Sequence, residues 1–137
     1  MRRSLQTAPI RLRSELDLAP FSKTAHHPVM ITMHGLFDLK SGCREDRFAA
    51  AYRRFAIHLV EAKLIVSWRM MRRRPDPNYD SSPPATGFHV TVDFADYAQA
   101  EACWEHIEHN REASHLLHRG VYAQIENYRF YLSEDID

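Results

Sequence analysis

The sequence predicts an α+β domain in which a four-stranded antiparallel sheet, with strand order 4-1-3-2, carries two helices on one face. Two observations predict this fold. Between residues 30 and 132 the apolar positions follow the order strand, helix, strand, strand, helix, strand, a βαββαβ arrangement. The length of 137 residues is that of one domain, enough for a single hydrophobic core.

The first half of the domain is a strand, a helix and a strand. Residues 30–39 alternate apolar and polar side chains, which predicts a half-buried strand. Residues 44–63 carry apolar side chains at spacings of three and four, which predicts an amphipathic helix. Residues 64–73 contain β-branched and aromatic types and end in a cationic run, which predicts a second strand. The apolar stripe of the helix is Phe48, Tyr52, Phe55 and Leu59.

A long connection and the second half of the domain follow. Residues 75–86 are rich in Pro and Ser, which predicts a mobile arm or a lid-like loop rather than a tight hairpin. Residues 87–94 alternate strictly and predict the third strand. Asp96 is the expected N-cap of the second helix, which runs to about residue 110, with Gln99 as its capping-box partner. A short extra helix is expected at 111–118, ending at Gly120. The last strand is expected at 121–132.

Composition excludes several classes of protein. Lys plus Arg and Asp plus Glu number 18 each, and this balance argues against a nucleic-acid binder, which is usually basic. No apolar run approaches the length of a membrane span, so no membrane partner is expected. Two cysteines, Cys43 and Cys103, without a secretory signal indicate reduced structural thiols and a cytoplasmic location.

Residues 1–29 differ from the rest of the chain. They have no sustained apolar period and are interrupted by prolines. We interpret them as an N-terminal tail that is disordered or not native, since Met30 directly precedes the first strand and an upstream start codon would add such a segment. The domain itself is expected to span residues 30–137.

The sheet face opposite the helices has no predicted element packed against it. Its expected side chains are mixed in polarity, so the face is suited either to water or to a second copy of itself. A two-fold, self-complementary contact is the commonest way to close such a surface, and it predicts a homodimer. The side chains expected on this face are Thr32, His34, Leu36, His89, Thr91 and Asp93.

Three segments carry a resemblance to known proteins. They are FDLKSGCREDRFAAAYRRFAIHL, LIVSWRMMRRRP and GFHVTVDFADYAQAE, and the most recognisable piece is Trp68-Arg69 followed by Arg72-Arg73. From residue 30 onward the chain resembles uncharacterised small proteins of the dimeric α/β-barrel, ferredoxin-like superfamily. The resemblance implies a ferredoxin-like sandwich and a homodimer formed sheet to sheet. That superfamily includes cofactor-independent monooxygenases, haem-binding members, isomerase-like enzymes and stress-response domains. Since no motif selects one branch, no catalytic residue is carried over.

Two histidines and an aspartate are the candidate catalytic residues. His34 and His89 are expected on neighbouring antiparallel strands, pointing away from the apolar face, with Asp93 on the same side. A carboxylate near an imidazole raises the pKa of the imidazole and orients its ring. The alternative, which we favour, is that these side chains are structural polar residues that hydrogen-bond across a dimer seam.

Aromatic and cationic side chains are the candidate ligand-binding residues. Trp68, Trp104 and Tyr52 are expected to line a pocket between helices and sheet, although aromatic residues at such spacings are more often core. Arg69 and Arg72 could bind an anionic ligand. The alternative for the arginines, which we favour, is that their charge protects a sheet edge from aggregation.

Motifs for metals and cofactors are weak. The pairs His106/His109 and His115/His118 each have the spacing of one helix face, but neither comes with further ligands at a recognised spacing. No glycine-rich phosphate loop occurs in the sequence. We therefore expect no metal and no cofactor.

The sequence predicts an uncharacterised dimeric domain with no assignable catalytic motif, and it does not decide whether the protein is an enzyme. The alternative is a small-molecule-binding enzyme of the cofactor-independent monooxygenase type. That alternative requires a pocket between the sheet and the helices, gated by residues 75–86, for a small aromatic or anionic ligand.

Overall fold

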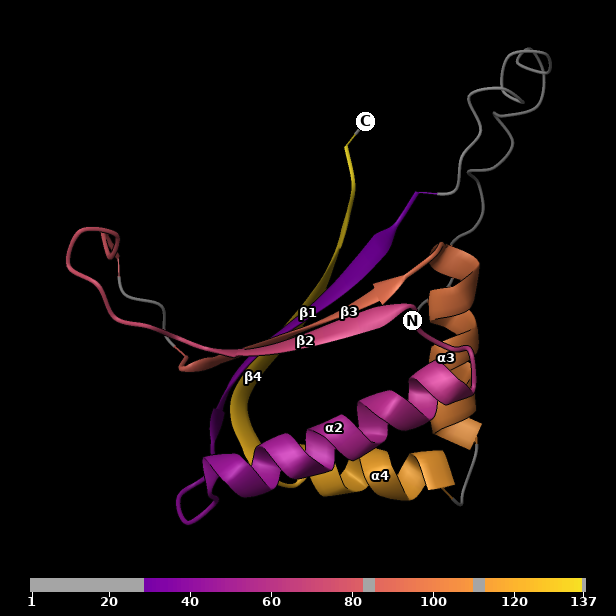
Figure 1. Cartoon of the computed structure of the whole chain (residues 1–137), viewed down its shortest axis with the longest axis horizontal. Coiled ribbons are helices and arrows are strands. Elements are labelled where there is room, and N and C mark those ends of the chain that lie inside the picture. Colours follow the sequence, from indigo (N-terminus) through magenta and orange to yellow (C-terminus); the bar gives the residue numbers. More distant parts are fainter. Residues whose placement is uncertain (1–28, 83–85, 110–112, 137) are drawn as a thin grey trace.

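The computed structural model describes residues 29–82, 86–109 and 113–136. Within these ranges the chain forms an α+β sandwich of one sheet and three helices (Figure 1). Residues 1–28 of the segment interpreted as a tail lie outside the described residues. Val29 is the first residue that the structure describes. The elements are β1 (Ile31–Leu39), α2 (Glu45–Glu61), β2 (Ser67–Arg72), β3 (Phe88–Phe94), α3 (Tyr97–His109), α4 (Ala113–Tyr122) and β4 (Ile125–Glu134).

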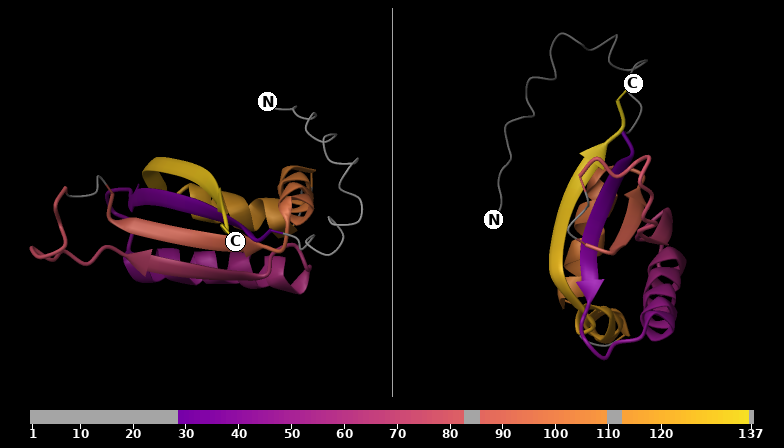
Figure 2. Two further views of the ribbon diagram at one scale, coloured as in Figure 1. Left: turned by 90° about the horizontal axis from the view of Figure 1, so that it is seen from above. Right: turned by 90° about the vertical axis from the view of Figure 1, so that its left-hand side faces the viewer.

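The four strands lie in the order β2-β3-β1-β4, and each neighbouring pair is antiparallel. This is the predicted order 4-1-3-2, which is confirmed. Helices α2 and α4 run beneath one face of the sheet and α3 stands at its end, so among the described residues no helix covers the other face (Figures 1 and 2). We call that uncovered surface the open face.

The alternation read from the sequence separates the two faces. On β1, Ile31 and Phe37 point toward the helices and are buried, as are Val90, Val92 and Phe94 of β3. The polar residues between them point to the open face. The core therefore lies in one layer between the sheet and the helices, where aromatic side chains of β1 and α2 meet, as in the contact of Phe37 with Phe48.

The start of α3 confirms Asp96 as the predicted N-cap, whereas Gln99 bonds the backbone N–H of Ala95 and not, as a capping box requires, that of Asp96. The backbone N–H of Gln99 donates to Asp96 Oδ1 at 2.9 Å. The Gln99 side chain in turn accepts a hydrogen bond from the backbone N–H of Ala95 at 2.7 Å. These bonds satisfy helix-start groups that would otherwise lack partners.

The prediction of where the extra helix ends was wrong. Helix α4 continues through Gly120 to Tyr122, and the last strand starts only at Ile125. A glycine ends a helix when its backbone takes the left-handed conformation, which Gly120 does not. The continued turn buries Val121 at 7% exposure against the core. The domain thus has three described helices rather than two and a short fragment.

No helix in the described ranges combines the length and apolar character needed to cross a membrane. The two cysteines are both free thiols in the structure, so no disulfide joins Cys43 to Cys103.

Candidate functional site

A cavity of about 500 Å³ lies between the inner face of the sheet and the described helices. Strands β1, β3 and β4 line one side, and helices α2, α3 and α4 line the other. This volume falls within the range of small-molecule sites. Its aromatic lining consists of Phe37, Phe48, Tyr52, Phe55, Phe94, Trp104, Tyr122, Phe130 and Tyr131, and most other lining residues are aliphatic.

The cavity opens along the β4 edge of the sheet. Five of its lining residues, Trp104 of α3, Tyr122 of α4 and Phe130, Tyr131 and Leu132 of β4, are more than one-third exposed. The remaining lining side chains, such as Phe48, are largely buried. The exposed part of the lining therefore consists of aromatic and aliphatic side chains.

Polar groups are few in the cavity lining. No Asp, Glu, Lys or Arg belongs to its lining in the described part of the chain. Burial raises the pKa of the Cys103 thiol to about 11, so the thiol stays protonated. Burial, and then the neighbouring Cys103, raise the pKa of Tyr52 far above its usual range.

His118 and Tyr122 of α4 supply two further polar groups of the lining. Burial, and then the nearby His115, lower the pKa of His118 below its ordinary value, so its imidazole is neutral at pH 7. Burial, and then a hydrogen bond with Tyr128, raise the pKa of Tyr122 to about 12. The rings of His118 and Tyr122 stack with centroids 5.4 Å apart.

The structure places the predicted aromatic residues unequally. Tyr52 and Trp104 lie on the cavity wall. Trp68 is not part of that wall; it packs edge-on against Tyr52, with ring centroids 5.8 Å apart, and supports the wall from behind. Periodicity alone placed all three in the same layer. Trp68 does lie on the helix side of the sheet, opposite Val92, but β2 is the edge strand farthest from β4 and adds no residue to the cavity lining.

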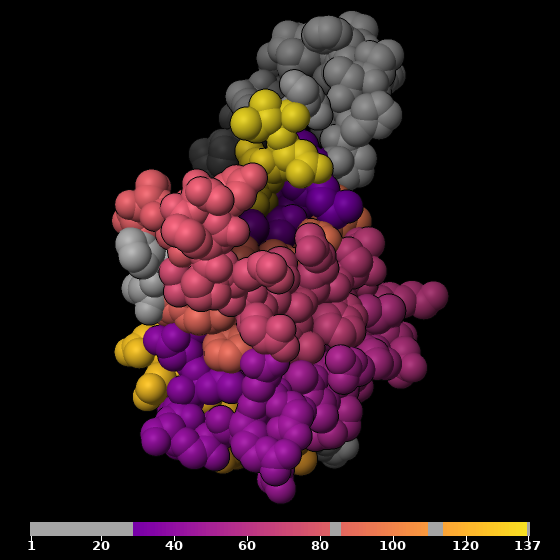
Figure 3. Space-filling view, turned by 60° about the vertical axis from the view of Figure 1, so that its left-hand side comes forward, coloured from indigo at the N-terminus to yellow at the C-terminus, as the bar shows by residue number. Residues whose placement is uncertain are grey.

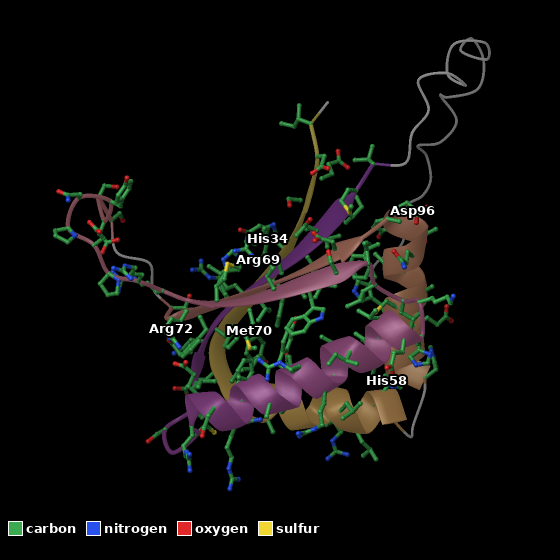
Figure 4. All side chains as sticks on the ribbon, in the orientation of Figure 1. His34, His58, Arg69, Met70, Arg72 and Asp96 are labelled. Carbon is green, nitrogen blue, oxygen red and sulfur yellow. The ribbon has the colours of Figure 1, made fainter. Side chains whose placement is uncertain are left out.

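The predicted arginines lie away from the cavity. Arg69 points to the open face, and Arg72 points to the helix side, where its guanidinium pairs with Glu45 at the start of α2 (Figure 4). Both belong to β2, which is an edge strand of the sheet. Neither contributes to the cavity lining, and their assignment as anion ligands stays a prediction without support from this geometry.

The predicted catalytic residues gather on the open face. His34 Nδ1 lies 3.1 Å from His89 Nε2, and His34 Nε2 lies 2.8 Å from the hydroxyl of Ser133. His34 also stacks on Tyr131 at 4.6 Å between centroids. Burial lowers the pKa of His89 first of all, and the charges of His34 and Arg69 lower it further.

Asp93 shares this face but contacts neither histidine. Its two carboxylate oxygens each accept a hydrogen bond at 2.7 Å, one from the hydroxyl of Thr32 and one from that of Ser67. The carboxylate therefore joins β1, β3 and β2 rather than orienting an imidazole. The residues form an internally hydrogen-bonded polar surface, and a catalytic role for them stays a prediction.

Sequence reasoning missed a buried polar cluster at the junction of the helices. The hydroxyl of Ser114, fully buried in α4, lies 2.5 Å from Nε2 of His58 in α2 and 2.5 Å from Nε2 of His106 in α3. A hydroxyl donates one hydrogen bond and accepts others, so it can satisfy both imidazoles and tie the helices together. No group of three or more metal-ligating side chains occurs within the described ranges.

The loop after β2 does not border the cavity. Residues 73–82 project from the body of the domain (Figures 1 and 3). The Asp80 carboxylate holds them together, accepting hydrogen bonds from the Arg73 guanidinium and the Asp76 backbone N–H, both at 3.0 Å. No residue of 73–82, nor Thr86, belongs to the cavity lining. The geometry of the described loop residues thus gives no support to the predicted lid.

Comparison with known proteins identifies a family without an assigned activity. Residues 30–135 match the family described as a family of unknown function, DUF6614. No curated protein matches the chain. Solved structures do match, and among them is a dimeric ferredoxin-like protein of unknown function from a Jannaschia species. That protein has a TM-score of 0.53 and 12% identity, over 79% of this chain and 99% of that chain.

Two enzymes also share the fold. A hydroxynitrile lyase from Passiflora edulis has a TM-score of 0.60 and 8% identity, over 80% of this chain and 96% of its own. A mutant of SnoaB, a cofactor-independent oxygenase from Streptomyces nogalater, has a TM-score of 0.56 and 12% identity, over 76% of this chain and 90% of its own. At such low identity these similarities show a ferredoxin-like fold alone, and the expected resemblance to uncharacterised ferredoxin-like proteins is confirmed.

Proposed function

The chain belongs to the family of unknown function DUF6614, and from this premise we propose that it binds a small, mainly apolar molecule between its sheet and its helices. The cavity of about 500 Å³ carries the proposal. Well-packed protein interiors hold few voids larger than a water molecule, so an apolar opening of this size in a small domain is suited to an occupant.

An enzyme of the cofactor-independent monooxygenase type is the second candidate. The similar fold of an oxygenase described as cofactor-independent supports it, as does a neutral imidazole, His118, on the cavity wall. The same fold also occurs in a hydroxynitrile lyase, so the fold by itself does not choose a reaction. Ligand binding is therefore the function that the geometry supports best.

The binding proposal is tested with an uncharged fluorescent probe, N-phenyl-1-naphthylamine, titrated with the purified protein. We expect saturable binding with one probe per chain. Ile107→Trp fills part of the cavity and should weaken binding about tenfold or more, because Ile107 lines it. Ile57→Trp is the matched control on the exposed outer side of α2 and should leave the affinity unchanged. Equal affinity in both variants, or no saturable binding, would refute the proposal.

We also propose that two copies associate through their open faces, giving a dimeric α/β barrel. The Jannaschia protein of similar fold is described as dimeric. Hydrogen bonds within the face already satisfy Asp93 and His34, so a partner can cover these groups at a small desolvation cost. Leu36 and Met71 add apolar surface, since their register partners place them on the same face.

Sedimentation velocity distinguishes a dimer from a monomer. Leu36→Arg puts a charge in the middle of the open face, where Leu36 lies opposite His89, and should convert the dimer to a monomer. Ile57→Arg places the same charge on the outer side of α2 and should leave the dimer intact. Wild-type protein that sediments as a monomer at 100 µM would contradict this assembly.

Residues 30–137 are proposed as the functional unit, working in a reducing compartment such as the cytoplasm. The free state of both cysteines and the family match at residues 30–135 support this proposal. Mass spectrometry of the protein as its natural host produces it tests the proposed N-terminal boundary at residue 30. Peptides from residues 4–29 would contradict translation from Met30.

A further inference from the structure

We propose that Tyr52 and His118 form a two-point polar recognition site inside the cavity, selective for an uncharged aromatic molecule that bears a hydroxyl group. This inference rests on the proposed function, since it requires the cavity to hold a ligand. It adds the chemical class of that ligand and the two side chains that recognise it.

Tyr52 is a buried residue whose hydroxyl has no hydrogen-bond partner among the described residues. The residue is 5% exposed and lies on the cavity wall, on the inner stripe of α2. Its ring is held by edge contacts with Phe55 and Trp68, at 6.5 Å and 5.8 Å between centroids. No side chain or backbone group in the described ranges hydrogen-bonds the hydroxyl. Since the hydroxyl of a buried tyrosine usually has a partner, the cavity is where that partner belongs.

His118 presents a second polar group to the same space. Its ring packs on Phe55 at 5.6 Å and on Tyr122 at 5.4 Å between centroids. Neither ring nitrogen has a hydrogen-bond partner in the part of the chain that the structure describes. The neutral imidazole has one N–H donor and one nitrogen lone pair, so it can accept a hydrogen bond from a hydroxyl. The lowered pKa of His118 keeps it in this neutral form.

Phe55 places the two groups on one wall. Its ring contacts Tyr52 at 6.5 Å and His118 at 5.6 Å between centroids, so a phenol from α2 and an imidazole from α4 both line the helix side of the cavity next to Phe55. A ligand hydroxyl that reaches the phenol accepts a hydrogen bond from it, and one that reaches the imidazole donates a hydrogen bond to it. A molecule that lacks a hydroxyl leaves at least one of these protein groups without a partner.

The rest of the lining sets the charge and shape of the ligand. Because no Asp, Glu, Lys or Arg lines the cavity in the described part of the chain, a charged ligand would be buried without a counter-charge, which is costly. Aromatic rings such as Phe48, Phe94 and Trp104 offer faces and edges to a planar ring. These conditions favour an uncharged hydroxyaromatic compound over a carboxylate or an amine.

Three compounds of similar size test the inference: naphthalene, 1-naphthol and 1-naphthoate, each competing with the uncharged fluorescent probe at pH 7.5. We expect 1-naphthol to bind about fivefold or more tightly than naphthalene, and the naphthoate anion to bind most weakly. The preference for 1-naphthol over naphthalene should fall to within about twofold in Tyr52→Phe or in His118→Phe, whichever residue pairs with the naphthol hydroxyl, while naphthalene affinity stays nearly unchanged.

Matched controls separate this effect from a general disturbance. Tyr79→Phe removes an exposed hydroxyl from the loop after β2, and His109→Phe removes an exposed imidazole from α3; both should keep the wild-type preference. Circular dichroism and naphthalene affinity report whether each variant is folded. His118→Leu is a second variant at that position, and it should show the same preference as His118→Phe.

The outcomes distinguish this inference from the proposal beneath it. If neither the probe nor any of the three compounds binds, the proposed function fails. If naphthalene and 1-naphthol bind equally to the wild-type protein, or the preference persists in both cavity variants, the recognition site is overturned and the cavity proposal stands.

Discussion

Replacing Gly35 by Ala is expected to destabilise the domain by about 1–2 kcal/mol. Gly35 lies in the centre of β1, where an added Cβ would sit 2.8 Å from Cε1 and 3.0 Å from Cδ1 of Phe130, and 3.1 Å from Cγ2 of Val90. Carbon atoms pack best at about 3.5–4.0 Å, so the Phe130 ring must move. Overpacking of this kind costs about 1–3 kcal/mol, and the smaller backbone entropy of alanine offsets about 0.5–1 kcal/mol of that cost.

Gly120 provides a control position, where the same substitution is expected to raise the free energy of unfolding instead of lowering it. It lies inside α4, and a Cβ added there would meet no atom within 4 Å. Gly120→Ala therefore removes only the unfavourable helix propensity of glycine, and it should stabilise the domain by about 0.5–1 kcal/mol. The same chemical change thus has opposite consequences at two positions, because only one of the two glycines faces a packed ring.

Urea denaturation, monitored by circular dichroism, gives the free energy of unfolding of each variant by linear extrapolation to zero urea. The double variant Gly35→Ala, Phe130→Leu should be less destabilised than the sum of its single variants, because the smaller side chain relieves the contact. Since Phe130 lines the mouth of the cavity, Gly35→Ala should also weaken probe binding. A Gly35→Ala variant as stable as wild type, or additive single variants, would refute this reasoning.

Further predictions concern other contacts of the domain. Ser114→Ala should destabilise it by about 2 kcal/mol in urea denaturation, because two imidazoles lose a buried partner, whereas Ser133→Ala, which removes one exposed bond, should cost under about 0.5 kcal/mol. The lowered pKa of His89 means that below about pH 6.5 the unfolded state binds more protons than the folded state. Stability should therefore fall as the pH drops through this window toward the folded-state pKa, and His89→Gln should flatten that decline; an unchanged slope would contradict it. Lys63→Gly should stabilise by about 0.5–1 kcal/mol, since Lys63 has a left-handed φ of 62° directly after α2, and an unchanged denaturation midpoint would show that this backbone carries no strain.

Much of the fold was predictable because strands and helices leave different periods in the sequence. The alternation at residues 87–94 and the stripe of α2 each predicted the face that is buried. The N-cap at Asp96 was readable because its carboxylate accepts a hydrogen bond from a backbone N–H only three residues further on. The end of α4 was not readable, because Gly120 ends a helix only if the chain turns there, and the burial of Val121 favoured another helical turn.

The candidate site was predictable only in part. Tyr52 and Trp104 were singled out by their aromatic character, but the cavity also depends on His118 and Phe130, which come from the last third of the chain. The spacing of His115 and His118 indicated a shared helix face and gave no hint that only His118 points into the cavity. Likewise, Ser114 gave no signal that it would meet His58 from the other end of the domain.

The amino-acid sequence by itself determined the order of the elements, their inner and outer faces and the order of the strands, because periods of 2 and 3.6 residues are local properties of the chain. The tertiary structure alone decided that a phenol from α2 and an imidazole from α4 share one wall of an apolar cavity, more than sixty residues apart in the chain. The common position of Tyr52 and His118 depends on how α4 packs under the sheet. Contacts between residues so far apart in the chain leave no periodic pattern in the sequence.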